Sequence, residues 1–317
     1  MGTIRKVLFL IVILLLAFTQ TKPAQMSNYC YVPPFIATSV KPNVLIVMDY
    51  SGNMQLPAYV PCNVSNLTGV VACGSITASY DPNKTYQGYF DPNKCYKDTN
   101  QGFEENNCAC QHDKIGSLTC MSGNLLNWIT TTRIDIARKV LTGGKSSSAR
   151  GSTFLISEGA TISIMDSTTG CIYTITATQP DNRRLTVTGT SCRFGANQIK
   201  NVPIKMKIND PSSITGIIQD LCDTSDLNGQ INEKCRVITE FMVYGGSRKG
   251  RMKVGKNATI SELISAINNE PPEGNEVATG EALWEAYDFY KQSNDHNYES
   301  NTAYIGRGNG NTDPYYD

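Results

Sequence analysis

Three oxygen-bearing side chains stand at alternate positions early in the chain, where they could bind a metal ion. Asp49, Ser51 and Asn53 offer a carboxylate, a hydroxyl and an amide, and Gly52 lies between the last two. Oxygen ligands with no histidine or cysteine nearby are those that hard divalent cations such as Mg²⁺, Ca²⁺ or Mn²⁺ prefer. The triplet is therefore a candidate site for such a cation.

A strand must carry these residues to an edge of the protein. Val44 to Met48 are an apolar run of strand-forming residues, and the run ends abruptly at Asp49. In open α/β sheets, ligands bind in the crevice beyond the carboxyl ends of the strands. We therefore expect a buried strand that delivers the polar loop to the carboxyl edge of such a sheet.

The sequence offers little for catalysis. Its two histidines, His112 and His296, lie in polar, loop-like sequence, and there is no Gly-x-Ser-x-Gly elbow, His-Glu-x-x-His motif or Gly-rich phosphate cradle. Asp49 and Ser51 could be mistaken for a nucleophile pair, but no base accompanies them. We expect a protein that is not an enzyme, and a hydrolase is the weaker alternative.

Charge and hydropathy bear on partners and compartment. The 317 residues carry 28 basic and 28 acidic side chains, which gives no electrostatic reason to expect a nucleic acid partner. Arg5 and Lys6 precede the apolar run Val7 to Phe18, which has the size of a signal-peptide core and is short for a membrane span. We expect residues 1–25 to be a signal peptide, with membrane contact only during export; an uncleaved anchor is the alternative.

Eleven cysteines agree with export, because disulfides persist in oxidising compartments. With only two histidines in the chain, a zinc site is a poor alternative. We expect local disulfides, above all Cys171 with Cys192 and Cys222 with Cys235. The odd count leaves one cysteine as a free thiol, as half of an intermolecular bridge, or with a partner outside this chain.

The remainder divides into an extended lead-in, residues 26–42, and a long domain, residues 43–317, that carries two insertions. The first insertion, residues 55–121, is Cys-rich and contains a repeated Asp-Pro-Asn-Lys, beginning at Asp81 and Asp91. Each repeat is typical of a turn, and calcium ligation by its aspartate is the alternative. The second insertion, residues 150–206, alternates apolar and polar residues, which predicts a small set of half-buried antiparallel strands.

Helical periodicity lies between the two insertions. Ser122 is a plausible N-cap, an apolar stripe follows it, and Gly143 ends the stripe. Arg133 and Asp135 interrupt this stripe, most simply as a solvated face or as a local pair.

The polar triplet resembles the metal-ion-dependent adhesion site of von Willebrand factor type A domains, with Asn53 where that family has its second serine. The resemblance implies an α/β, Rossmann-like sheet with helices on both faces. The family adds a ligand threonine from a Gly-Gly-Thr-x-Thr-Gly-x-Ala-Leu loop. Here Thr279-Gly-Glu-Ala-Leu283 matches the latter part, but Val277 stands at the ligand position. Thr279 therefore either substitutes as a ligand or only caps a helix.

A narrower resemblance rests on the Asp-Pro-Asn-Lys repeat and on the block that runs from Gly123-Asn-Leu-Leu-Asn-Trp128 to Leu141-Thr-Gly-Gly144. Together they resemble the amino-terminal region of the PilY family, exported bacterial proteins of type IV pilus assembly and of pilus-tip adhesion. The resemblance implies a non-catalytic binding module in the periplasm, at the outer membrane, or at the pilus tip and cell surface. Its partners would be pilus components, or host or surface ligands that present an acidic group.

The same resemblance implies a C-terminally incomplete domain, because family members continue into a strand whose final aspartate closes the adhesion site. We therefore expect Asp49, Ser51, Asn53 and Thr279 to form a degenerate site that binds Mg²⁺ or Ca²⁺ weakly or not at all. The alternative is a generic secreted type A adhesin unrelated to pili.

Overall fold

The computed structural model describes residues 41–62, 72–110, 120–149, 152–179, 181–189, 192, 199–245, 248–272, 274 and 278–291. This part is mixed α/β, with three sheets and six α-helices. The expected signal peptide, Cys30, both histidines and Val277 lie outside the described residues. Among the helices that are described, none has the length and apolar character needed to cross a membrane.

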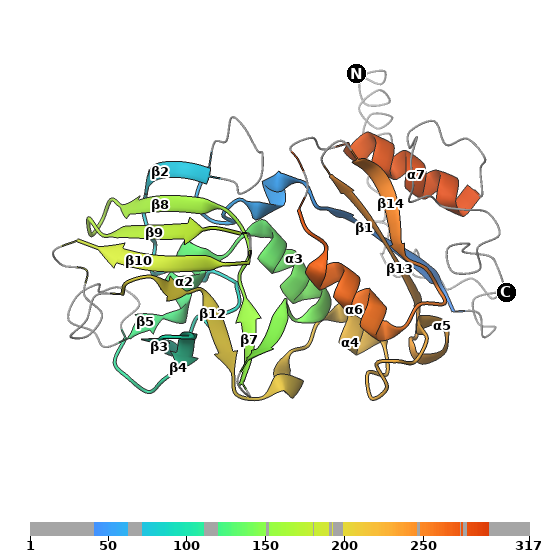
Figure 1. The fold of residues 1–317 in the computed structure, drawn as a ribbon, viewed down its shortest axis with the longest axis horizontal. Coiled ribbons are helices and arrows are strands. Elements are labelled where there is room, and N and C mark those ends of the chain that lie inside the picture. The colour runs from blue at the N-terminus through green and yellow to red at the C-terminus, as the bar shows by residue number, and fades with distance from the viewer. Residues whose placement is uncertain are drawn as a thin grey trace, which may run out of the picture. The chain divides into compact units, whose positions relative to one another are not determined.

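The strand that leads to the polar triplet belongs to a sheet of three strands (Figure 1). β1 (Asn43–Asp49) pairs in parallel with β13 (Ile238–Gly245), so that Asn43 faces Ile238 and Asp49 faces Tyr244. β14 (Arg248–Val254) pairs antiparallel with β13. The parallel pair places the carboxyl ends of β1 and β13 at one edge, as the apolar run predicted for β1.

Helices cover both faces of this sheet. On one face, α3 (Arg133–Thr142) and α6 (Ile260–Asn269) contribute Ile134 and Leu263 to a core with Phe241. On the other, α7 (Thr279–Lys291) packs Phe289 against Met242. Two short helices, α4 (Ile217–Leu221) and α5 (Ile231–Lys234), precede β13.

Two larger sheets are built from both predicted insertions. Their strand order is β11 (Val202–Pro203), β10 (Arg183–Thr188), β9 (Ile172–Ala177), β8 (Thr161–Asp166), β2 (Ala72–Ala78) in one sheet. In the other it is β5 (Met121–Ser122), β3 (Cys95–Thr99), β4 (Gly102–Glu105), β12 (Lys205–Ile208), β7 (Ser152–Ile156), β6 (Ser146–Ala149). We call these two sheets with α2 (Gly123–Thr130) the inserted body.

The inserted body has one shared core rather than two separate ones. β2 from the Cys-rich segment pairs in parallel with β8 from the β-rich segment, and β4 pairs in parallel with β12. Aromatic residues of the Cys-rich segment, such as Phe90 and Phe103, are buried with Trp128 of α2 and Tyr173 of β9. The Cys-rich segment therefore supplies much of the apolar core of the inserted body.

The predicted helical stretch between Ser122 and Gly143 is two helices, because the chain leaves the helix at Thr131 and Thr132. Ser122 caps α2 as predicted, since its Oγ accepts the N–H of Leu125 at 3.1 Å. Thr132 precedes α3, and its own N–H donates to Asp135 at 3.3 Å. β-Branched threonines disfavour helix at the end of α2. The cap formed by Thr132 and Asp135 then starts α3.

Five disulfides join all ten cysteines of the described residues. Cys171–Cys192 and Cys222–Cys235 confirm the two predicted pairs. The others are Cys62–Cys73, Cys95–Cys110 and Cys108–Cys120, which are also local in sequence. These three disulfides crosslink the Cys-rich segment to itself.

Candidate functional site

The candidate metal loop begins where β1 ends. Asp49 is the last residue of β1, and its Oδ1 accepts the N–H of Ser51 at 2.7 Å. Ser51 is 0% exposed, and its Oγ has no hydrogen-bond partner among the described residues. Gly245 at the end of β13 lets the loop approach, since a Cβ there would lie 2.5 Å from the Ser51 nitrogen. Two oxygen donors thus sit side by side at the carboxyl edge of the sheet.

The other two predicted ligands, Asn53 and Thr279, are not placed beside each other as Asp49 and Ser51 are. Asn53 lies in the 3₁₀ turn η3 (Gly52–Gln55), is half-buried, and its backbone carbonyl accepts from Arg133 Nη1 at 3.4 Å. Thr279 is the first residue of α7, one position inside a true N-cap, and is exposed. The segment before α7 does touch the loop, because the N–H of Gly52 donates to the Gly274 carbonyl at 2.6 Å. Among the described residues, Thr279 makes no hydrogen bond to Asp49, Ser51 or Asn53.

These residues fit a divalent cation only in part. A buried hydroxyl without a partner is costly, and a cation beside Asp49 would satisfy that of Ser51. Against this, the described residues contain no group of three or more histidine, cysteine or acidic side chains that could hold a metal. The guanidinium of Arg133 adjoins the loop and disfavours a second positive charge.

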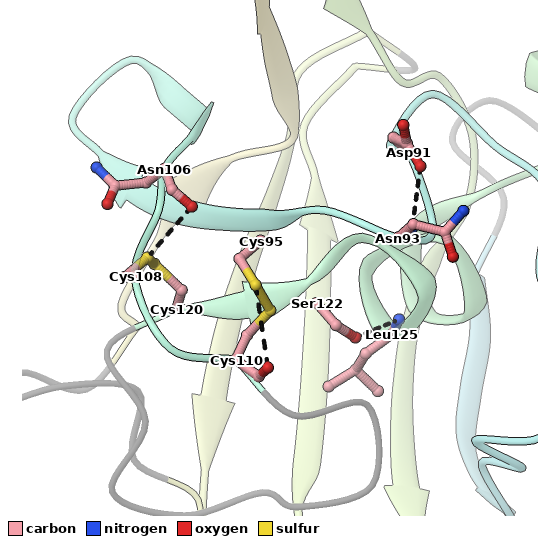
Figure 2. The surroundings of a disulfide bond; sticks show 9 residues. All are labelled: Asp91, Asn93, Cys95, Asn106, Cys108, Cys110, Cys120, Ser122 and Leu125. Carbon is pink, nitrogen blue, oxygen red and sulfur yellow. Dashed lines mark hydrogen bonds between the residues drawn. A yellow bond between two sulfur atoms is a disulfide. The ribbon is translucent and has the colours of Figure 1, made fainter.

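The two Asp-Pro-Asn-Lys repeats are turns of one design, as predicted. Each aspartate accepts the N–H of the residue two positions on, at 3.0 Å for Asp81 and 2.9 Å for Asp91, and Figure 2 shows the second of these reaching Asn93. Each aspartate carbonyl accepts the lysine N–H at 3.1 Å. In both repeats the aspartate N–H donates to the tyrosine hydroxyl five residues later. The side chains are thus engaged in Asx turns, which explains the repeat without calcium.

The block that begins at Gly123 holds these turns in place. Asn124 accepts the N–H of Tyr86 at 2.7 Å and donates to the Lys84 carbonyl at 2.8 Å. Asn127 accepts the N–H of Phe90 at 3.1 Å and donates to the carbonyls of Tyr86 and Phe90, both at 2.8 Å. Both amides are buried, so α2 satisfies the backbone of a loop that has no strand partner there.

Two glycines permit this contact between loop and helix. A Cβ at Gly123 would lie 1.9 Å from the Asp91 carbonyl oxygen, and one at Gly88 would lie 2.2 Å from Thr131 Oγ1. The sequence block is therefore explained by packing: its glycines allow close approach and its asparagines bind the approaching backbone.

Asp135 is not on a solvated face, and the sequence-based prediction for it was wrong. It is 1% exposed, and its carboxylate accepts from Ser157 Oγ at 2.7 Å and from the Glu158 N–H at 3.0 Å. Arg183 reaches the same place, with Nη1 2.5 Å from Ser157 Oγ, and burial lowers the pKa of Arg183 to about 10. Arg133 is exposed, which agrees with the solvated face that was one of the two alternatives for this pair of residues.

One turn further along α3, Arg138 lies at the centre of a buried ion network. Its Nη1 is 2.6 Å from Glu158 Oε2, and Lys145 Nζ lies 3.0 Å from the same oxygen. Arg138 also donates to the carbonyls of Ile267 at 3.1 Å and Glu270 at 2.9 Å, at the end of α6. The network joins the connection between β7 and β8 to the helical face of the three-stranded sheet.

Tyr50 extends this network to the candidate loop. Its hydroxyl donates to the Ile267 carbonyl at 2.5 Å, and the Arg138 guanidinium lies 5.9 Å from its ring centroid. Burial raises the pKa of the Tyr50 hydroxyl, so it remains a donor at neutral pH. The hydrogen bond to α6 therefore holds Tyr50, the residue between Asp49 and Ser51, in place.

Sequence reasoning missed Asn124, Asn127 and Arg138 as organising residues. Asn124 and Asn127 are three positions apart, the spacing of one helix face, and this face adjoins the apolar stripe. The Thr132-x-x-Asp135 spacing is a capping signal that marks the start of α3. For Arg138, no local pattern points to partners on Glu158 and α6.

Comparison with known proteins finds a family model that matches most of the inserted body. The model of a "PilY1 homolog, small alpha/beta domain" matches residues 77–215, from the end of β2 to the turn η4 (Pro211–Ser213). This range contains the repeats' anchoring helix α2 and most of both larger sheets, and it excludes β1, β13 and β14. No solved structure matches the chain significantly.

Two curated relatives from Xylella fastidiosa (strain Temecula1 / ATCC 700964) are each described as a type IV pilus biogenesis factor PilY1 homolog. One is 38% identical over 101 residues, which is 32% of this chain and 6% of the relative. The other is 31% identical over 109 residues, which is 30% of this chain and 8% of the relative. The chain thus aligns with a small fraction of each relative's length. Residues 77–215 match the PilY1-homolog domain, and these comparisons support a relationship of this part of the chain to PilY-family proteins of type IV pilus biogenesis.

Proposed function

We propose that this chain is an exported, non-catalytic binding module of type IV pilus biogenesis that acts at the cell surface or pilus tip. The observation that carries the proposal is the family match over the inserted body, whose anchoring residues Asn124 and Asn127 are buried and bonded. The described disulfides support export, because such bonds persist in oxidising compartments. The match favours a pilus protein over a generic secreted adhesin.

The three-stranded sheet is proposed to be a von Willebrand A-like sheet. Its parallel pair β1 and β13, its antiparallel neighbour β14 and its helices on both faces support this proposal. So does the position of Asp49 at the carboxyl end of β1, where ligands bind in α/β sheets.

Within that sheet we propose a degenerate adhesion site. Asp49 and Ser51 would hold Mg²⁺ or Ca²⁺, Asn53 and Thr279 would complete the set only after movement, and a bound cation would offer a coordination position to a partner's carboxylate. The orphaned Ser51 hydroxyl supports a ligand at this place. The small number of oxygen donors implies weak binding.

Gene deletion tests the pilus function. We expect loss of surface pili or of twitching motility, restored by the wild-type gene in trans. Normal piliation and twitching together with reduced surface attachment would instead support the generic adhesin.

Calorimetric titration with Mg²⁺ and Ca²⁺ tests the site. We expect dissociation constants of about 10⁻³ M or weaker, at the weak end of extracellular sites. Micromolar binding that disappears in Asp49→Ala would contradict a degenerate site.

A further inference from the structure

A pocket of about 610 Å³ opens beside the second Asp-Pro-Asn-Lys turn, far along the chain from the candidate metal loop. It is bounded by that turn, by the ends of β4 and β12, and by α3. Its volume is that of sites that bind small molecules or short peptide segments. Charged and aromatic side chains dominate its lining, among them Tyr89, Asp91, Lys94, Glu105, Lys139 and Lys207. All its lining residues lie within the range that matches the PilY1-homolog domain.

The three lysines of this pocket differ in how their charge is met. Lys94 lies 2.9 Å from Glu105, and Lys207 lies 3.2 Å from Glu104. Lys139, from α3, is half-buried and donates to the Gly88 carbonyl. In the part of the chain that the structure describes, it makes no ion pair with an acidic side chain.

Lys139 is therefore a partly desolvated cation held by a neutral oxygen. Burial lowers its pKa, and the nearby Asp91 opposes that shift without forming an ion pair. Removing a cation from water is costly unless an anion or several hydrogen bonds compensate it. An anionic group that entered the pocket would supply the missing partner and make a charge-assisted hydrogen bond.

We propose that this pocket binds an acidic peptide segment, with a carboxylate of the peptide placed on Lys139. The acidic side chains of the lining repel a phosphate dianion more strongly than a singly charged carboxylate, because the repulsion scales with the ligand's charge. The same acids can accept amide N–H groups of a peptide, and Tyr89 and Met206 offer apolar contact. The site needs no metal ion, so it is independent of Asp49 and Ser51.

The direct test compares two peptides in a buffer that contains EDTA. The purified chain is titrated with acetyl-Gly-Glu-Gly-amide and with acetyl-Gly-Gln-Gly-amide, and binding is followed by saturation-transfer NMR. We expect the glutamate peptide to bind in the millimolar range and the glutamine peptide about tenfold more weakly, since only the former offers a charged acceptor. Equal affinities, or no binding of either peptide, would refute the proposal.

Substitution locates the contact. Lys139→Gln is expected to weaken the glutamate peptide about tenfold, through loss of the charge-assisted bond. Lys97→Gln is the matched control, because Lys97 is exposed on β3 and does not line the pocket. Equal binding by Lys139→Gln and wild-type protein would contradict the assignment.

A second measurement does not depend on any variant's folding. Acetic anhydride acetylates lysine amines that are accessible and in their neutral form. The glutamate peptide should cover Lys139 and protect it from acetylation in wild-type protein while leaving Lys97 reactive. Mass spectrometry of both positions reads this out. Similar labelling of Lys139 with and without the peptide would argue against the proposed contact. Because EDTA is present throughout, a negative result bears on this pocket alone and not on the metal loop.

Discussion

Arg138 and Glu158 form an ion pair that is closed to water, with side-chain exposures of 0% and 3% and 2.6 Å between Nη1 and Oε2. The arginine lies on α3 and the glutamate on the connection between β7 and β8. Arg138 also donates to the Ile267 carbonyl of α6 and to that of Glu270, which caps this helix, so a single side chain ties the inserted body to the helical layer of the three-stranded sheet.

Replacing Arg138 by methionine should therefore destabilise the protein by about 3–5 kcal/mol, because a buried glutamate loses its main partner. Urea unfolding followed by fluorescence of Trp128, which is buried in the inserted body, measures this. Arg133→Met is the control on the same helix. It should change the free energy of unfolding by less than about 0.5 kcal/mol, because Arg133 is exposed. Equal effects of the two substitutions would show that the buried pair has no special role.

Asn127→Ala should destabilise the inserted body, because it leaves the N–H of Phe90 and the carbonyls of Tyr86 and Phe90 without partners. Each buried group left unpaired costs about 1–3 kcal/mol. Asn107→Ala, at an exposed position, provides the control. Urea unfolding compares the two; a loss below 1 kcal/mol for Asn127→Ala would mean that water replaces the amide.

Two glycine-to-alanine substitutions should change the stability of the protein in opposite directions. Gly123→Ala would place a methyl group 1.9 Å from the Asp91 carbonyl oxygen and should destabilise the protein by about 1–3 kcal/mol. Gly280→Ala, in the first turn of α7, meets nothing within 4 Å and should stabilise it by up to about 1 kcal/mol. Melting temperatures of both variants decide the matter. Stabilisation by Gly123→Ala would mean that the loop moves away from α2 at little cost.

Removal of the disulfide Cys171–Cys192, by Cys171→Ala with Cys192→Ala, should cost about 3 kcal/mol, because it frees a loop whose ends are 21 residues apart. Unfolding under non-reducing conditions gives the value. If the double variant is as stable as wild type, the loop would have to be held mainly by its strands.

Ser51→Ala should leave stability in EDTA unchanged or raise it by up to about 1 kcal/mol, since it removes a buried hydroxyl that has no partner. Thermal unfolding in EDTA is the measurement. A clear loss of stability would show that this hydroxyl is bonded in solution and is not kept available for a ligand.

Features set by neighbouring residues could be predicted from the sequence. The apolar run before Asp49 predicted β1, Ser122 predicted the start of α2, and short spacings predicted two disulfides. The Asp-Pro-Asn-Lys repeats predicted their turns because aspartate and proline act on adjacent backbone. Within the candidate metal loop, the adjacency of Asp49 and Ser51 was predictable for the same reason.

Features that depend on partners distant in the sequence could not be predicted. The sequence around Asp135 is that of a surface residue, because its partners Ser157 and Glu158 are distant in the chain. Likewise, the pocket beside Lys139 exists only because β4 and β12 pack next to it. The pairing of β2 with β8 joins two segments that periodicity treats as unrelated. The place of Thr279 also depends on residues beyond its own helix.

The pairing of Asn43 with Ile238 has a consequence for how the chain matures. Translation produces β1 long before β13, and everything between them must be accommodated before the first sheet can close. Contacts so remote in sequence slow folding and prolong exposure of sticky intermediates. The nascent polypeptide therefore carries an unpaired apolar strand until β13 has been synthesised, and a holdase chaperone that shields this strand would raise the yield.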